Sequence, residues 1–464
     1  MSQALSRRAR TSTTVAPDLV IVTDPGPDPD DTKALLVAAA LHKQKAITLR
    51  AVVANGGGQP NARAALARAV LDHVGGRDVP VGAGSAGHPC SPQPHELRLE
   101  GVSTVDPARI RDGSELLNEV LRDAAPRSLV FVCISSLRDL CDLILSDPAR
   151  FKERTREVAI QGGLSCTCGC CGEEVGAPDM GSGSPVAPRA RDGPCRDPAA
   201  TGGETAAAGS AHARTDSTSR VAAPGSCPNC GCAGRLSWSP DTSVNNSFDM
   251  AAAAAVYAFC LEQGVSLSVT SRHAVPPLPM QLARSFATVT RDPIMQYLSD
   301  AQFLGLAGLW RRLCAGELPE RCSKQWFFET FCGVSSEEFS AKGYEALSTD
   351  VNIVDHLNGF VKPYDVICLM TVLPITRDLF SRLGLHYRGD RGAEFRLFLK
   401  ADAAVGTDLV LRLLRQTYHE SVLAASPGSV ARNRLVGELS RTFGEGGMEA
   451  LAFADSAQDA EAEA

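Results

Sequence analysis

Residues 20–40 read VIVTDPGPDPDDTKALLVAAA, an apolar run followed by four aspartates within eight positions and then by a helix-forming stretch. The β-branched run predicts a buried strand, and the Ala/Leu-rich stretch predicts a helix. Carboxylates gathered on one loop repel each other unless a cation or amide donors compensate them, so a hard divalent ion is the economical explanation. The alternative is that Asp30 or Asp31 only caps the helix, but capping does not account for Asp24 or Asp28.

Similar apolar runs recur through the first third of the chain. They lie at residues 19–23, 47–54, 79–83, 128–135 and 156–163, and amphipathic stretches separate them. This alternation predicts an α/β fold, with a mostly parallel β-sheet flanked by helices on both faces. Ligands of such sheets bind at the carboxyl ends of the strands, which is where the aspartates follow the first strand.

Composition divides the 464 residues into five segments. We expect a disordered N-terminal tail (1–17), the first part of the α/β domain (18–163), a disordered insertion rich in Gly, Ser and Cys (164–240), the second part of the domain with helical additions (241–450) and an acidic tail (451–464). The insertion has almost no large apolar residues, so it cannot offset its ordering entropy. Within the second part, the sequence predicts a helix and a strand over 245–271, mostly helix over 276–347, and a loop running into a helix over 363–374.

Charge and hydropathy exclude several classes of partner. The formal net charge of -7 leaves no basic footprint for nucleic acid. The longest uncharged apolar stretch, 251–261, is far short of the roughly 18 residues of a membrane helix. The N-terminus lacks the apolar core of a secretory signal, although its Arg and Ser/Thr content has some likeness to an organellar transit peptide. We therefore expect a cytoplasmic protein with small-molecule or protein partners, and organellar targeting stays open.

Sixteen cysteines divide into two kinds. Several lie in apolar segments and are expected to be buried thiols in a reducing compartment. The others cluster in the insertion, as CTCGCCG (166–172) and CPNCGC (227–232). One hypothesis is a zinc site, and the other is an unstructured thiol-rich loop. The candidate zinc ligands are Cys166, Cys168, Cys227 and Cys230.

Five motifs in register resemble the inosine-uridine preferring nucleoside hydrolases. TDPGPDPDDTKALL (23–36) is similar to the family signature DxDPGxDD, which an apolar helix follows. The other four are AVVANGGGQPNARAALARAVLDHVGGRDVPVGAG (51–84), LVFVCISSLRDLCDLILSDPARFKERTREVAIQGG (129–163), NNSFDMAAA (245–253) and PYDVICL (363–369). The resemblance spans most of residues 19–375 outside the insertion and points to a divergent member of that family.

The resemblance implies calcium-dependent hydrolysis of the N-glycosidic bond of ribonucleosides to free base and ribose, as in purine and pyrimidine salvage. Asp24 would bind calcium and act as general base for the attacking water. Asp31, Asp365 and the backbone carbonyl of Ile134 would complete the protein ligands of the ion. Carboxylate and carbonyl ligands favour calcium over zinc.

The ribose would be bound by residues from the same loops. By the resemblance, Asp30 binds the ribose hydroxyls, Asp365 touches the 3'-hydroxyl, and Asn55 and Asn245 line the pocket. Family members are often dimers or tetramers, so a homo-oligomer is one expectation.

Three departures from the family pattern affect this interpretation. Val22 replaces the first Asp of the signature, and its loss would weaken the support of the metal site. Two extra residues place Asp28 at the usual spacing of the ribose Asp, so Asp28 is an alternative to Asp30. Tyr364 stands where many members have a His that protonates the leaving base, with His356 and His273 as weaker substitutes.

Two other functions compete with a nucleoside hydrolase. A magnesium phosphatase of the haloacid dehalogenase type requires an Asp two residues after Asp24, but Gly26 occupies that position. The second alternative is a catalytically degenerate hydrolase fold that binds nucleosides or proteins. Val22, Tyr364 and the insertion favour this degenerate form.

Overall fold

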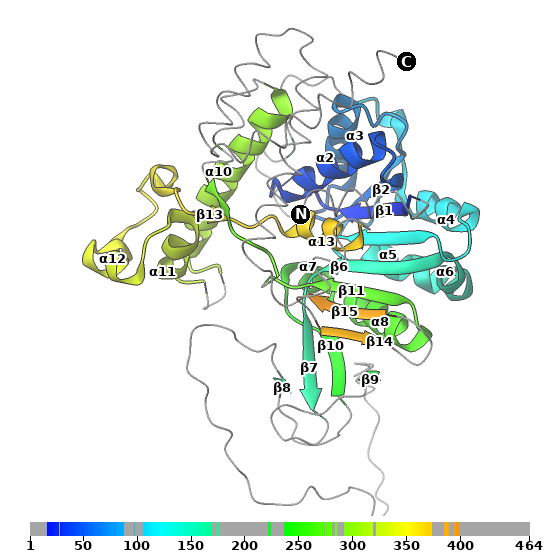
Figure 1. Cartoon of the computed structure of the whole chain (residues 1–464). Helices are drawn as coiled ribbons and strands as arrows, with labels where there is room; N and C mark the ends of the chain where they lie inside the picture. The colour runs from blue at the N-terminus through cyan, green and yellow to red at the C-terminus, as the bar shows by residue number, and fades with distance from the viewer. Residues whose placement is uncertain are drawn as a thin grey trace, which may run out of the picture.

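The computed structural model describes residues 16–26, 28–87, 97, 105–168, 174–175, 221–223, 236–272, 274–280, 284, 292–318, 322–373, 385–388 and 394–398. A nine-stranded sheet in the order β14-β15-β11-β6-β5-β1-β2-β3-β4 forms its centre (Figure 1). The strands are β1 (Asp18–Thr23), β2 (Thr48–Ala54), β3 (Val81–Ala83), β4 (Ile110–Asp112), β5 (Leu129–Cys133), β6 (Thr155–Gln161), β11 (Ser266–Thr270), β14 (Leu385–Arg388) and β15 (Glu394–Phe398).

Neighbouring strands from β15 to β4 run parallel, and only β14 pairs antiparallel, with β15. The predicted α/β class with a mostly parallel sheet is therefore confirmed. The predicted strands at the five apolar runs and before residue 271 are present. The sequence analysis assigned no strand at β4, β14 or β15, which lie at or next to the edges of the sheet.

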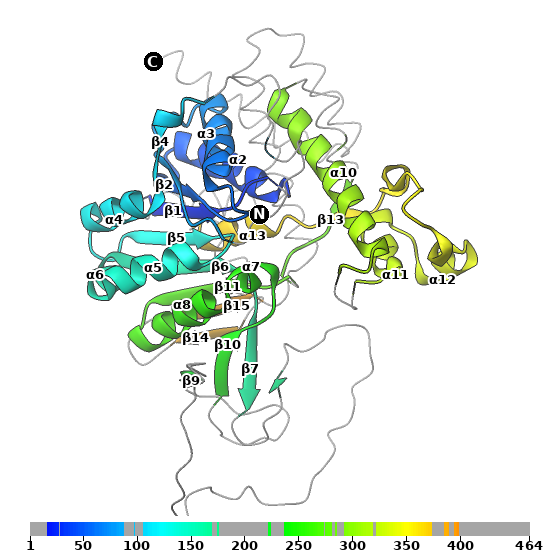
Figure 2. The same cartoon turned by 180° about the vertical axis from the view of Figure 1, so that it is seen from behind.

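Helices cover both faces of the sheet (Figure 2). They are α2 (Asp30–Lys43), α3 (Pro60–His73), α4 (Gly113–Asp123), α5 (Arg138–Ser146), α6 (Pro148–Arg154), α7 (Val244–Phe248), α8 (Met250–Gln263), α10 (Pro293–Cys314), α11 (Lys324–Phe327), α12 (Ser336–Ala341) and α13 (Tyr364–Val372). One apolar core joins α2, α3, α10 and α13 to one face, and a second joins α4, α5, α6 and α8 to the other. Within β1, Leu19 and Ile21 belong to the first core, and Val20 and Val22 to the second. Burial of both faces explains the continuous apolar runs.

The order of the strands reverses beside β1, which creates a topological switch point there. From β1 the chain proceeds to β2, β3 and β4 on one side, and then returns to build β5, β6 and β11 on the other side. Loops that leave β1 and β5 therefore diverge, and ligands of open α/β sheets bind in the resulting crevice. The aspartates after β1 lie at this crevice.

Local sequence fixes how the segments around β1 continue. Helix α2 begins with Asp30 and Asp31 and ends with His42 and Lys43, which complement the helix dipole at both ends. Between β2 and α3, three consecutive glycines adopt positive φ angles, of 79° at Gly56, 66° at Gly57 and 72° at Gly58. Glycine alone adopts this conformation readily, so the turn brings the start of α3 close to the end of β1.

The insertion differs from the prediction at its two ends. The first and last five residues of 164–240 were expected to lack regular structure, but they form β7 (Leu164–Cys168) and β10 (Leu236–Pro240), which pair antiparallel. With β8 (Glu174–Val175) and β9 (Val221–Ala223) they make a four-stranded sheet that extends away from the central one (Figure 1). The alternation of polar and apolar residues in LSWSP suits such a ladder. Other parts of the insertion, the tail before residue 16 and the acidic tail lie outside the described residues.

The predicted helical additions are present as α10, α11 and α12. They pack around buried aromatic rings, with Trp310 5.2 Å from Phe327 and 5.8 Å from Phe328 between centroids. The short β12 (Leu278–Pro279) and β13 (Phe360–Val361) pair antiparallel and lead the chain towards α13. Within the described ranges, no helix is both long and apolar enough to cross a membrane.

Candidate functional site

Four aspartates meet at the carboxyl end of β1. Asp24 directly follows the strand, and Asp30 and Asp31 form the first turn of α2. Asp365 lies in the first turn of α13, which packs against α2. These residues were predicted to form one site, and the structure brings them together across a separation of 335 positions between Asp30 and Asp365.

Asp31 turns back towards β1. Its Oδ1 accepts hydrogen bonds from the Thr23 hydroxyl and, at 2.9 Å, from the Asp24 backbone N–H. These bonds fasten the loop between β1 and α2 at both of its ends. The start of α2 has no side-chain cap hydrogen bond, so the described bonds of Asp31 fasten the loop rather than cap its own helix.

Asp30 joins α2 to α13. Its Oδ2 accepts a hydrogen bond of 3.1 Å from the Asp365 backbone N–H at the start of α13, where helix amides need acceptors. Its Oδ1 is buried without a hydrogen-bond partner, and the Lys33 ammonium lies 3.9 Å away. Lys33 is itself held by Gln302 of α10, at 2.9 Å. A buried oxygen without a hydrogen bond is costly unless a ligand or ion completes it.

Asp24 is held by an arginine that the sequence analysis did not single out. Arg63 of α3 donates from one guanidinium nitrogen to the Asp24 carbonyl at 2.7 Å and to Asp24 Oδ2 at 2.9 Å. Arg63 is only 4% exposed. The guanidinium is therefore part of the site.

Burial raises the pKa of all four carboxyl groups. The pKa of Asp24 rises from its ordinary value of 3.8 to about 7, although the charge of Arg63 opposes the shift. The pKa of Asp30 also rises to about 7 by burial, against the opposing charge of Lys33. Asp31 and Asp365 are shifted well upward by burial and by their acidic neighbours. Removal of these groups from water, more than repulsion among the carboxylates, therefore raises their pKa values.

Ile134 and Val22 lie side by side in the sheet. Ile134 directly follows β5 and donates its N–H to the Val22 carbonyl at 2.9 Å, which puts its backbone at the switch point. Val22 is fully buried in the core of the opposite face from α2. A carboxylate in place of Val22 would face that apolar core, so valine is the residue that suits this packing.

Asn55 belongs to a second buried network, one strand away from Asp24. Its amide donates to the Ser136 carbonyl at 3.1 Å and to Asp139 Oδ2 at 2.7 Å. Asp139 also accepts bonds from the Ser85 backbone N–H, at 2.7 Å, and the Ser85 hydroxyl, at 2.8 Å. The network ties together the loops after β2, β3 and β5, and it leaves Asn55 Oδ1 buried without a partner. Asp139 was not among the predicted site residues.

Replacing Asp139 by alanine is expected to lower the free energy of unfolding by about 2–4 kcal/mol. The change removes the Asp139 carboxylate, which accepts hydrogen bonds from the Asn55 amide, the Ser85 backbone N–H and the Ser85 hydroxyl. Urea denaturation of the full chain measures it. Asp142→Ala is the matched control, because Asp142 lies on the same helix but pairs with Arg138 at the surface. Equal losses for the two variants would contradict the assigned network.

Asn245 lies farther along the same edge of the sheet. It belongs to α7, and its amide donates to the side-chain oxygen of Gln161 at 2.6 Å and to the Gln161 carbonyl at 3.2 Å. Gln161 ends β6, two strands from β1. Asn245 is therefore at the correct end of the sheet, and its described bonds run to Gln161.

Tyr364 begins α13, next to Asp365. Burial and the charges of Asp30 and Asp28 raise its pKa to about 12, so the phenol stays protonated and can donate a hydrogen bond. Asp28 is exposed and accepts from the Asp30 N–H at 3.1 Å, a local Asx turn, whereas Asp30 is inside the cluster.

Of the two substitute histidines, His356 lies in the described part of the chain. His356 packs against Phe328 and Tyr344, with ring centroids 5.8 Å apart in both pairs. Its described ring contacts therefore lie in the aromatic cluster of the helical additions, and its role as a substitute proton donor stays a prediction. His273 lies outside the described residues.

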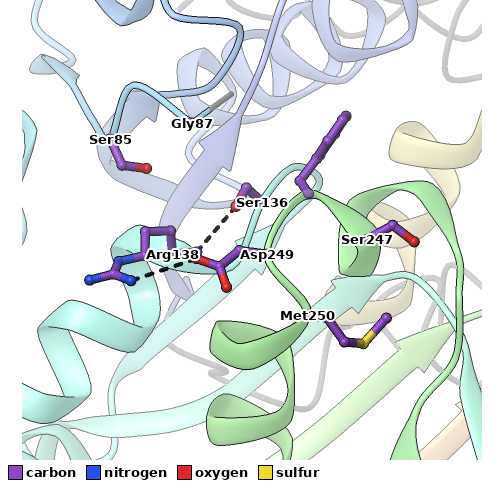
Figure 3. A pocket seen from close by; sticks show the side chains of 8 residues that line it. Ser85, Gly87, Ser136, Arg138, Ser247, Asp249 and Met250 are labelled. Atoms are coloured by element: carbon purple, nitrogen blue, oxygen red, sulfur yellow. Dashed lines mark hydrogen bonds and ion pairs between the residues drawn. The ribbon is translucent and has the colours of Figure 1, made fainter. Parts of the chain in front are cut away.

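A cavity of about 530 Å³ opens at the ends of β3 and β5, beside the Asn55 network, and none of the four aspartates is among its lining residues (Figure 3). It is lined by Ser85, Gly87, Ser136, Arg138, Ser247, Phe248, Asp249 and Met250. Arg138 and Asp249 form an ion pair in its wall, 3.6 Å apart. A Cβ on Gly87 would lie 3.2 Å from the Cα of Gly56, so the cavity adjoins the glycine turn before α3. Its volume is in the range of small-molecule sites.

The donor types at the cluster fit a hard divalent cation. They are carboxylate oxygens, and Asp30 Oδ1 is buried without a hydrogen bond. In the described part of the chain, however, no three carboxylate, thiol or imidazole groups are arranged to hold a metal ion. Asp24 instead faces Arg63, and Asp31 faces Thr23. The residues therefore suit calcium by chemistry, while their side chains bond to the protein's own donors.

The zinc hypothesis for the insertion stays a prediction. Cys166 and Cys168 lie in β7, where they pair in register with Trp238 and Leu236 of β10. Cys227 and Cys230 are outside the described residues.

Comparison with known proteins gives structural matches only. No protein-family model and no curated protein matches the sequence. The type III effector protein XopQ, solved in complex with adenosine diphosphate ribose, is similar with a TM-score of 0.61 and 21% identity, over 90% of this chain and 98% of that chain. The effector protein XOO4466 is similar with a TM-score of 0.57 and 21% identity, over 91% and 98%. A purine-preferring ribonucleoside hydrolase from Gardnerella vaginalis has a TM-score of 0.46 and 11% identity, over 88% and 99%. At 21% identity, the likeness to the two effector proteins shows the α/β fold that this chain shares with them.

Proposed function

We propose that this protein hydrolyses the N-glycosidic bond of ribonucleosides in a calcium-dependent reaction. The observation that carries the proposal is the cluster of three buried aspartates, Asp30, Asp31 and Asp365, with the half-buried Asp24 at the switch point of the sheet. A buried group of this charge is unfavourable for folding alone, and such perturbed carboxyls gather at functional sites. The resemblance of the aspartate loop and of PYDVICL to nucleoside hydrolases supports the same reaction.

Each residue has a role in this proposal. Asp24 removes the proton of the attacking water, and a pKa of about 7 suits a general base near neutral pH. Asp24, Asp31, Asp365 and the Ile134 carbonyl would hold the ion. Calcium, when bound there, would orient the water and lower its pKa.

The sugar and the base are assigned to the surrounding loops. Asp30 binds ribose hydroxyls, together with Asp365, Asn55 and Asn245. Tyr364 donates its phenolic proton in a hydrogen bond to the departing base. Such stabilisation suits the oxocarbenium-like state of glycosidic cleavage, in which the leaving group gains negative charge.

The test is to incubate the purified full chain with a panel of purine and pyrimidine ribonucleosides and to measure free ribose. We expect ribose release that stops in EDTA and resumes when calcium is added. Absence of ribose from every nucleoside would refute the proposal, and release that is unaffected by EDTA would refute its calcium dependence.

A second candidate function is ligand binding without hydrolysis. It is favoured by Asp24, whose carboxylate is already bonded to Arg63, and by the cavity beside the Asn55 network. The chain shares its fold with XopQ, which was solved with adenosine diphosphate ribose. Calorimetry with this ligand and with inosine, followed by analysis of the products, separates the two functions. Tight binding with the ligand recovered intact favours the second.

A further inference from the structure

Arg63 introduces a cation where the proposed reaction places a metal ion. Its guanidinium reaches Asp24 from α3, at 2.7 Å from the carbonyl and 2.9 Å from Oδ2. The glycine turn closes over this pair, because a Cβ on Gly56 would lie 3.9 Å from both Asp24 Cβ and the same guanidinium nitrogen. The pair is therefore enclosed between the end of β1, the turn and α3.

The charges of the cluster show what Arg63 does there. Asp24, Asp30, Asp31 and Asp365 carry -4 when ionised, and the Arg63 and Lys33 cations next to them carry +2, which leaves -2. Removal of Arg63 would leave -3. Its loss therefore increases the attraction for any further cation, since charges in a buried site are weakly screened.

We propose that Arg63 is a built-in countercation of Asp24 that competes with a divalent ion for this carboxylate and so keeps the calcium affinity of the site low. The inference rests on the proposed calcium site. An ion bound to Asp24 would lie at 2.3–2.6 Å from its oxygens, and it would repel a guanidinium bonded to the same carboxylate. In the structure Asp24 is bonded to Arg63, and Asp31 is bonded to Thr23. A bound ion would have to displace these donors or share the carboxylates with them.

Helix α3 supplies a matched control. Arg68 lies five residues further on, is 2% exposed, and bonds to the Gly76 carbonyl at 2.7 Å and to Asp72 at 2.8 Å. These partners belong to the other end of α3 and to the turn after it. Arg68→Gln therefore removes a second buried guanidinium from the same helix without touching Asp24.

The test is calorimetric titration of the full chain with calcium chloride after treatment with EDTA. Arg63→Gln keeps a hydrogen-bond donor for the Asp24 carbonyl but removes the charge, and it is expected to bind calcium about tenfold more tightly or better. Arg63→Lys keeps the charge and should bind calcium as the unaltered protein does. Arg68→Gln should leave the affinity unchanged. Calcium binding by Arg63→Gln that is equal to or weaker than that of the unaltered protein would overturn the inference.

The outcomes also separate this inference from the proposed function. If the unaltered protein binds calcium and Arg63→Gln binds it no better, competition is wrong and the calcium site stands. If neither binds calcium, the site and the inference fall together.

A second experiment measures thermal unfolding in EDTA and serves if Arg63→Gln folds poorly. Arg63→Gln should lower the melting temperature by roughly 5–10 °C, and the double variant with Asp24→Asn should recover part of that loss. Additive losses in the double variant would show that the two side chains are not coupled and would overturn the inference.

Discussion

Asp24→Asn is expected to lower kcat for nucleoside hydrolysis by about 10²- to 10⁴-fold. Asparagine keeps the shape of the side chain but cannot accept the proton of the attacking water. It also removes one of the proposed calcium ligands, so the calcium affinity should fall with it. Free ribose measured over time with saturating nucleoside and saturating calcium gives the comparison.

The matched control for this variant is Asp123→Asn. Asp123 ends α4 with a side chain that is 57% exposed, and it lies 3.6 Å from Arg122 at the surface. Its replacement should leave kcat unchanged. Ribose release that survives Asp24→Asn would refute the role of Asp24 as general base. Loss of hydrolysis with nucleoside binding retained is the outcome that the mechanism requires.

The central sheet was predictable because its chemistry is local. A continuous apolar run such as LVIVT has one stable place in a protein of this composition, a strand buried on both faces, and the alternation of such runs with helical stretches gives the parallel order. The edge strands were not predictable in this way. β4 reads IRD, β14 reads LHYR and β15 reads EFRLF, so each contains charged residues and none is a continuous apolar run. Their pairing depends on tertiary neighbours that no local pattern encodes.

The aspartates of the site were predictable for a different reason. Asp24, Asp30 and Asp31 stand out because four carboxylates on one loop are an unfavourable arrangement without compensation. Asp365 was reached through the resemblance of PYDVICL to the family segment. The sequence itself contains no signal that joins α13 to the first loop, and the hydrogen bond from the Asp365 N–H to Asp30 makes that junction.

Arg63 and Asp139 were not predicted as site residues from the sequence. Both lie in the first turn or first two turns of amphipathic helices, where a charged residue is usually exposed to solvent. Arg63 instead points towards β1, because the three glycines after Asn55 set the direction of α3. A positively charged residue shortly after such a turn, opposite an acidic loop, is the one signal that would have identified it.

Without calcium, the protein is expected to become less stable as pH rises from about 4 to 7. The pKa values of Asp24 and Asp30 are near 3.8 when unfolded and about 7 when folded, so over this range the folded state binds more protons. The free energy of unfolding then falls with increasing pH, and this contribution of the two groups is lost once pH exceeds about 7. Denaturant unfolding in EDTA at several pH values measures the decline.

Asp30→Asn isolates this effect from other titrating groups. Asparagine can still accept the hydrogen bond from the Asp365 N–H, but it has no charge to bury, so the decline with pH should be shallower than in the unaltered protein. Calcium should raise the melting temperature more at pH 7.5 than at pH 5, because protons compete with the ion for the same carboxylates. Equal slopes for the two proteins would contradict the assigned burial of Asp30. A calcium-induced rise in melting temperature that is the same at both pH values would mean that the ion binds elsewhere. The aspartate cluster would then be balanced by its own buried cations, Arg63 and Lys33, and would bind the substrate without calcium.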